Sequence, residues 1–370
     1  MLPMKNKYQK YRVITAFVLI VLCMVIILSE AFLVKDKDAC GKIPTGAVLL
    51  EADIVGVYGD ADAIVTIISD DGDYVTSINL YRLMKERGIK CTVAGVISTI
   101  SEHINVWDKY VGEGVIDLVS HSYDHISMGE NSEISGDYYE LKHQIADADR
   151  FLEERYKSEQ IAFVCPENVM CSKGYDVLKA AGILAVRGDY EGFNSLSPQS
   201  GTEPGQWFNL YGMPIKGDGV TASVRDGWVN RAETQRSWLI EMWHDVRKEY
   251  DGQFQTITVE EAAGHLDYIA SEKRDGRIWV ATYTEAVKYI LERQNSKVTA
   301  YVDNDRLTVY CELTNDNMSY ETFNQPLTVS VKLPDNYEPV VGSNNRVDDG
   351  CLYVDIMPGE KINIDLIITG

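Results

Sequence analysis

Residues 63–72 read AIVTIISDDG, an apolar run that ends in two aspartates and a glycine. A short continuous apolar run of this kind predicts a strand buried on both faces, as in a parallel sheet. The polar residues that follow it would lie at the carboxyl end of the strand, where α/β folds bind their ligands. Asp70 and Asp71 are therefore the first candidate functional residues.

The chain beyond this run alternates short apolar segments with longer ones of helical period. Residues 75–87 place apolar side chains on one helical face and stop at Gly88. Strands that alternate with helices predict a mainly parallel sheet, open or closed into a barrel. His121, Pro166 and His244 follow later apolar runs, so we expect them at the same end of the sheet as the aspartate pair.

Two segments depart from this alternation. Residues 195–230 are rich in Gly, Pro and Ser with scattered aromatics, which fits either a surface loop with packed rings or a loop that stacks sugar rings beside an active site. Beyond residue 296 apolar residues recur at every second position, which predicts a small antiparallel β-sandwich over residues 297–370. Residues 61–296 then form the α/β domain, and residues 35–60 are a connector.

Residues 1–34 carry a targeting signal. A basic flank precedes residues 13–28, sixteen positions without a charge, and this order predicts export. Two outcomes remain open: a single signal anchor that holds the protein on the cell membrane, or a signal peptide cleaved near Ala31 that releases it. Both place the rest of the chain outside the cytoplasm.

Composition excludes some functions. The 370 residues carry a formal net charge of −21, and a phosphate backbone would be repelled, which argues against a nucleic-acid partner. Seven cysteines are present without a CxxC pair, so a structural zinc knuckle is not expected. Cys311 with Cys351, and Cys165 with Cys171, are pairs that export would permit; buried thiols are the alternative.

Three short segments carry the chemistry: the aspartate pair at 70–71, His121 with His125, and His244. A neutral imidazole and a carboxylate oxygen suit Zn²⁺ or a similar divalent ion. Each segment alone has an ordinary structural explanation, because two histidines four apart can lie on a helix surface and Asp-Asp-Gly can form a capped turn. Their joint occurrence at strand ends is typical of a metal-dependent hydrolase.

These segments resemble the motifs of the polysaccharide deacetylase family (the NodB-homology domain, carbohydrate esterase family four) over residues 60–295. The family's TFDDG motif appears at residues 68–72, its H-S/T-x-x-H motif at 121–125, and its apolar strand ending in histidine at 242–244. The resemblance implies a deformed (β/α) barrel, here followed by the C-terminal all-β sandwich domain.

The resemblance also implies roles. Asp71, His121 and His125 would hold a divalent metal, most often zinc in this family. Asp70 would be the general base, and His244 the general acid that protonates the leaving amine or alcohol. The implied activity is metal-dependent removal of N-acetyl or O-acetyl groups from an acetylated polysaccharide or oligosaccharide.

The family's third motif, F-R-P-P-Y-G, departs most, because it reads FVCPEN at residues 163–168. Val164 stands where the family has the arginine that orients the base, and Arg187 is the candidate for the missing cation. Glu167 replaces the tyrosine whose backbone N–H helps to stabilise the oxyanion, and that N–H is retained.

The expected substrate-binding residues are Pro166, Glu167, Asp189, Trp207 and Trp243. The lost arginine and the aromatic loop also fit an alternative, a non-catalytic carbohydrate-binding protein on the same fold. A third possibility is a hydrolase that removes formyl or another small acyl group.

Overall fold

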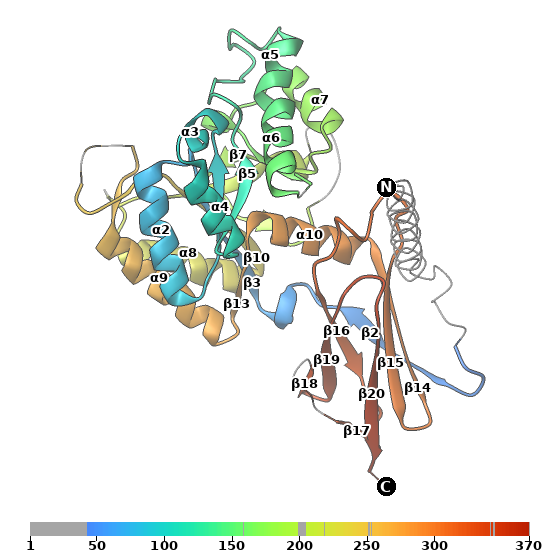
Figure 1. Ribbon diagram of the computed structural model, residues 1–370. Helices are drawn as coiled ribbons and strands as arrows, with labels where there is room; N and C mark the ends of the chain where they lie inside the picture. Colours follow the sequence, from blue (N-terminus) through green and yellow to red (C-terminus); the bar gives the residue numbers. More distant parts are fainter. Residues whose placement is uncertain are drawn as a thin grey trace, which may run out of the picture.

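The computed structural model shows an α/β barrel joined to a β-sandwich (Figure 1). The expected signal segment at residues 1–34 and the first part of the connector lie outside the described residues. Within the part that is described, no helix is both long and apolar enough to cross a bilayer. The described residues are 43–157, 159–198, 205–217, 219–250, 252, 254–340, 342 and 345–369.

Seven parallel strands close the barrel in the order β3-β4-β5-β6-β7-β9-β10, and β10 pairs back onto β3. β4 pairs only with the last two residues of β3, while β13 (Ile278–Val280) pairs with the first half of β3, so the ring is distorted there. The predicted deformed (β/α) barrel is thus confirmed. Its strands are β3 (Ala63–Ser69), β4 (Cys91–Gly95), β5 (Ile116–Ser120), β6 (Ala162–Val164), β7 (Ala185–Tyr190), β9 (Leu210–Ile215) and β10 (Ser237–Trp243).

Helices cover the outside of the barrel (Figure 1). α2 begins where the Asp73 side chain accepts the Thr76 N–H, and it stops at Gly88 as the sequence predicts, where the backbone turns left-handed. A π-helical turn, His143–Asp147, joins α5 to α6. The helices are α2 (Tyr74–Arg87), α3 (Ile97–Ser101), α4 (Ile104–Gly112), α5 (Tyr138–Lys142), α6 (Ala148–Tyr156), α7 (Ser172–Ala180), α8 (Ala222–Gln235), α9 (Val259–Arg274) and α10 (Tyr283–Gln294).

The opening apolar run is β3, and all of its residues are buried. Ile64 and Ile68 pack in one core cluster with the other inward-facing barrel residues, whereas Val65 and Ile67 pack under the helices. Both faces of the strand therefore lose water, which explains why the run does not alternate with polar residues. Each such side chain contributes about 1.5–3 kcal/mol by its burial.

Residues 195–230 are not one loop. They contain β9, which fills the barrel between β7 and β10, and the first part of α8. Gly212 and Pro214 concealed β9, because glycine weakens a strand pattern and proline cannot donate to the ladder. A two-residue strand, β8 (Asn194–Ser195), pairs antiparallel with β10.

The predicted C-terminal sandwich is confirmed as two antiparallel sheets, β1-β14-β15-β20-β17 and β18-β19-β16-β2. β1 (Val48–Leu50) and β2 (Ala52–Ile54) come from the segment interpreted as a connector; three residues each are too few to show a period. The remaining strands are β14 (Ser296–Asp303), β15 (Arg306–Leu313), β16 (Leu327–Lys332), β17 (Tyr337–Pro339), β18 (Asn345–Asp348), β19 (Cys351–Ile356) and β20 (Lys361–Ile368).

The two domains share a packed junction at α10, which lies between them in Figure 1. Tyr289 of α10 belongs to the sandwich core, and its hydroxyl donates to the Val55 carbonyl at 3.0 Å. The Tyr58 hydroxyl donates to the Asp355 carboxylate at 2.8 Å. These contacts fix the sandwich to the end of the barrel opposite the carboxyl ends of its strands.

The described cysteines are free thiols, four of them buried. Neither predicted pair forms: Cys311 lies on β15 and Cys351 on β19, which belong to different sheets, and Cys165 and Cys171 are separate buried thiols. Burial raises the pKa of the Cys165 thiol to about 12, which makes it a poor nucleophile.

Candidate active site

Three predicted metal ligands converge at the carboxyl end of the barrel. The Asp71 Oδ1 atom lies 3.5 Å from His121 Nε2 and 3.3 Å from His125 Nε2. Asp71 follows β3, and both histidines follow β5. Their ligand atoms all lie within 4.8 Å of one another. The positional argument from the sequence, that strand-end residues share one edge, is confirmed for these three.

The backbone around these ligands is tightly constrained. Asp71, Ser122 and His125 have φ angles of 71°, 70° and 57°, a left-handed conformation that costs free energy for residues other than glycine. Gly72 has a φ of 73°, and a Cβ there would lie 2.6 Å from the Ile100 side chain. The glycine of the Asp-Asp-Gly segment is therefore required by both backbone conformation and space.

The orientation of His121 fits a cation. Its Nδ1–H donates to the Val164 carbonyl at 2.8 Å, so the lone pair of the neutral ring lies on Nε2, facing the Asp71 carboxylate. Two acceptors in contact need a cation between them. Ligand atoms around a tetrahedral zinc, about 2.0–2.1 Å from the ion, lie about 3.3–3.4 Å apart, close to the two distances observed. The residues present thus fit a divalent metal.

The same groups keep one another in ligating protonation states. Burial opposes ionisation of Asp71, but the neighbouring His121, His244 and His125 side chains outweigh this and lower its pKa to about 2. Burial, with the neighbouring His121, lowers the pKa of His125. At neutral pH Asp71 is therefore a carboxylate and His125 a neutral imidazole, the forms that bind a metal.

The histidine loop is held from behind by the π-helical turn. The Gln144 carbonyl accepts the Tyr123 N–H, and its side-chain amide accepts the Asp124 N–H at 2.9 Å. The Ser122 hydroxyl accepts the His125 N–H. π-Helical turns are often found next to functional sites. No feature of the sequence pattern pointed to Gln144.

Asp70 lies beside the metal cluster and is paired with Arg187. Its Oδ2 accepts from Arg187 Nη2 at 2.7 Å, and the side chains are 3% and 0% exposed. His244 Nε2 lies 3.7 Å from the same oxygen. The suggestion that Arg187 supplies the missing cation is confirmed.

Strand register explains how Arg187 can replace an arginine at Val164. The two residues are direct partners in the β6–β7 ladder, so their side chains stand at the same level of the barrel. Space for the longer side chain comes from Gly212 on β9, where a Cβ would lie 3.2 Å from Arg187 Cδ and 3.3 Å from its Nη1. The cation has moved one strand along the ring while still reaching the base.

Comparison with known proteins agrees with the motifs. The polysaccharide deacetylase family model matches residues 59–186. This segment is thus similar to the polysaccharide deacetylase family. The match contains the metal cluster and Asp70 and ends before Arg187 and His244. No curated protein matches the chain.

Solved structures similar to this chain include three from bacteria. A protein from Mycobacterium smegmatis that is described as a polysaccharide deacetylase is 13% identical, with 67% of this chain and 96% of that one covered and a TM-score of 0.47. A family 4 acetyl xylan esterase from Clostridium thermocellum, crystallised with cobalt, is 15% identical (61% and 91%, TM-score 0.40). A family 4 pseudoenzyme from Bacillus anthracis is 13% identical (62% and 66%, TM-score 0.39).

The barrel has a cleft of about 210 Å³ around the paired aspartates. Tyr190 and Phe254, which sequence reasoning missed, flank it with rings that are 47% and 64% exposed. Phe254 lies edge-on to His244, with ring centroids 4.9 Å apart. The lining residues are Asp70, Asp71, His121, His125, Cys165, Glu167, Asn168, Arg187, Tyr190, Met242, His244 and Phe254.

The predicted substrate-binding residues differ in whether they line the cleft. Glu167 lines the cleft, whereas Pro166 is buried beside it. The Asp189 carboxylate accepts from the Asn209 side chain and the Tyr190 N–H and is absent from the lining. Trp207 and Trp243 are 5% and 0% exposed, so the prediction that they contact a glycan was wrong. Trp207 packs in the barrel core, which fits the packed-ring alternative for residues 195–230, and Trp243 of β10 packs in the core cluster under the helices.

A buried ionic network supports the strand that ends at His244. Glu241 Oε1 contacts His265 Nε2 at 2.8 Å, and His265 Nδ1 contacts Asp226 at 2.7 Å. Burial opposes the charge on His265, but attraction to Glu241 and hydrogen bonds to both carboxylates raise its pKa to about 9. Glu241 also accepts from the Trp243 indole, and the Trp243 carbonyl accepts the Asp70 N–H. The network therefore reaches the base through β10.

Proposed function

We propose that the protein is a metal-dependent deacetylase that removes N-acetyl groups, or O-acetyl groups, from a polysaccharide. The observation that carries the proposal is the cluster of Asp71, His121 and His125 beside a buried Asp70–Arg187 pair and His244. Zinc is the proposed ion, because one carboxylate and two imidazoles suit it. When bound, the ion supplies Lewis acidity at this point of the cleft.

Asp70 is the proposed general base. Arg187 binds its Oδ2, while its Oδ1 is buried and has no hydrogen-bond partner among the described residues. That oxygen is free to accept a proton from the attacking water. Arg187 fixes the carboxylate plane, so this lone pair keeps one direction, and general base catalysis contributes roughly 10²–10⁴-fold.

His244 is the proposed general acid. Its Nε2 faces the cleft near Asp70, and its ring is held edge-on by Phe254. A proton on Nε2 would pass to the leaving nitrogen or oxygen as the acyl bond breaks. The Glu167 N–H, on a left-handed residue at the cleft wall, is the proposed donor to the developing oxyanion. Tyr190 and Phe254 offer exposed rings for a sugar face.

Acetate release from a panel of acetylated glycans, with protein reconstituted in Zn²⁺ or Co²⁺, tests the proposal. We expect His125→Ala to abolish release and His103→Ala, at an exposed histidine outside the cleft, to leave it unchanged. Release by His125→Ala at the wild-type rate would contradict the proposal. Glycan binding without any acetate release would favour the non-catalytic alternative that Val164 suggests.

Export is also part of the proposal, and it rests on the basic and apolar order of residues 1–34. We propose that the catalytic domain acts outside the cytoplasm, on the membrane if this segment is kept and released if it is cleaved near Ala31. Fractionation of cells expressing the full chain distinguishes these outcomes, and recovery in the cytoplasm alone would contradict both.

A further inference from the structure

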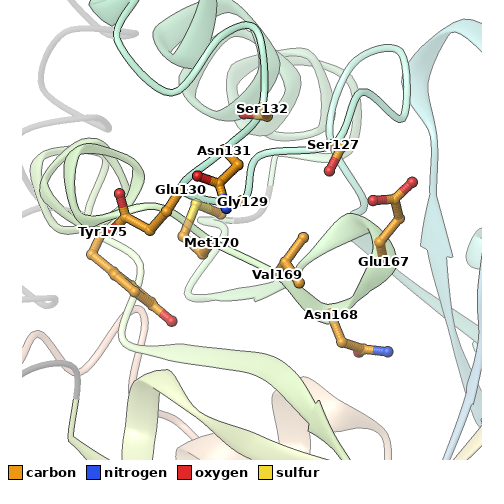
Figure 2. A pocket seen from close by; sticks show the side chains of 10 residues that line it. All are labelled: Ser127, Gly129, Glu130, Asn131, Ser132, Glu167, Asn168, Val169, Met170 and Tyr175. Atoms are coloured by element: carbon orange, nitrogen blue, oxygen red, sulfur yellow. The ribbon is translucent and has the colours of Figure 1, made fainter.

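A second hollow of about 600 Å³ lies next to the cleft, between the loop after β5 and the loop after β6 (Figure 2). Its two walls are fixed to each other, because Met128 and Met170 form a parallel bridge and the Cys171 N–H donates to the Met128 carbonyl at 2.6 Å. Glu167 and Asn168 line both this hollow and the cleft. A ligand in the hollow would therefore adjoin the reacting group.

The hollow is elongated. Figure 2 shows Glu167 and Ser127 at one end and Glu130 and Tyr175 at the other, with Val169 between them. Val169 is 39% exposed and offers an apolar surface. The volume of the hollow falls in the range of about 300–1,000 Å³ that holds small ligands. This shape suits a sugar that extends away from the cleft.

The charged residues that line the hollow are all negative. Among the described residues that line the hollow, the charged ones are two glutamates, with no lysine or arginine. Glu130 accepts from the N–H and hydroxyl of Ser172 at 2.7 and 2.6 Å, and these bonds lower the pKa of its carboxyl group. The hollow thus presents acceptors and negative charge, which an ammonium group with three donors would satisfy.

We propose that this hollow is a subsite for an amino sugar with a free amine, adjacent to the sugar whose acetyl group is removed. The proposal rests on the proposed function. Hydrolysis of an N-acetyl group consumes one water and yields acetate and an amine, which is protonated at neutral pH. Each turnover would therefore create the group that the subsite binds, so the protein would favour acetylated residues next to deacetylated ones. An anionic glycan would be repelled by both glutamates.

Binding of a glucosamine tetramer, which has no acetyl group, tests the subsite on the full chain by titration calorimetry. Glu130→Gln keeps the acceptor for Ser172 and removes only the charge; Glu133→Gln, in the same loop and outside the lining, is the matched control. We expect Glu130→Gln to weaken binding about two- to fivefold and added salt to weaken wild-type binding. Glu133→Gln and the N-acetylglucosamine tetramer should show no such change.

Equal affinity of wild type and Glu130→Gln for the glucosamine tetramer would overturn the subsite. Its failure can be told from failure of the proposed function, because the tetramer cannot react. Glu130-dependent binding without acetate release from any glycan leaves the subsite and overturns the deacetylase. Acetate release with binding indifferent to Glu130 does the reverse.

Discussion

The buried pair of Asp70 and Arg187 should be coupled much more strongly than a surface pair of better geometry. Arg155 and Asp108 form two bonds, at 2.7 and 2.5 Å, but their side chains are 35% and 40% exposed. Asp70 and Arg187 form one bond at 2.7 Å with exposures of 3% and 0%. If burial sets the coupling free energy, a unit charge pair about 4 Å apart is worth about 4 kcal/mol at an effective dielectric constant of about 20, against about 0.2–1 kcal/mol at the surface.

Two double-mutant cycles measure this difference by urea unfolding. One combines Asp70→Asn with Arg187→Met, the other Asp108→Asn with Arg155→Met. We expect a coupling free energy of about 3 kcal/mol or more in the first cycle and below about 1 kcal/mol in the second. The cycle cancels the free-energy contribution of the two other Arg187 nitrogens, which have no partner in the described structure. Coupling below about 1 kcal/mol in both cycles would refute the claim that Arg187 holds the base.

Gly212, His265 and the metal cluster can each be tested by a further measurement. Gly212→Ala should push Arg187 from Asp70, lower kcat at least tenfold and reduce stability by about 1–3 kcal/mol. Gly227→Ala is the control, because an added Cβ at this helical position meets no atom within 4 Å, and it should keep kcat. Equal kcat values for the two variants would contradict this prediction. The pKa of His265 is about 9 in the folded protein against a usual 6.5, which adds about 3 kcal/mol of stability below pH 6.5 that is lost as the pH rises to 9. Urea unfolding at both pH values should show this fall in the free energy of unfolding for wild type and a smaller fall for His265→Gln. Zinc titration should show tight binding by wild type and at least tenfold weaker binding by His125→Ala; equal affinity would place the ion elsewhere.

The barrel and its metal cluster were accessible to sequence reasoning because their signals are local. The run before Asp70 is apolar on both faces, and strand ends in a parallel barrel meet at one rim, so Asp71 and His121 could be placed together without a structure. The same reasoning needed no knowledge of which strands pair.

What escaped prediction depends on pairing between distant segments. β9 carries Gly212 and Pro214, which oppose strand formation locally but are tolerated between β7 and β10. Trp207 and Trp243 were misjudged because composition cannot tell an exposed ring from a buried one. Arg187 could be suggested from the sequence, but only the register that pairs it with Val164 explains why it reaches Asp70.

The origin of β1 and β2 has a consequence for how the chain can be divided. These strands precede the barrel, yet each forms an edge of a sandwich sheet, β1 against β14 and β2 against β16. In topological terms the barrel is an insertion within a discontinuous sandwich. A fragment of residues 297–370 would leave β14 and β16 with unpaired backbone groups that invite association with other chains, so excising the barrel calls for a short linker that rejoins residue 55 to residue 296.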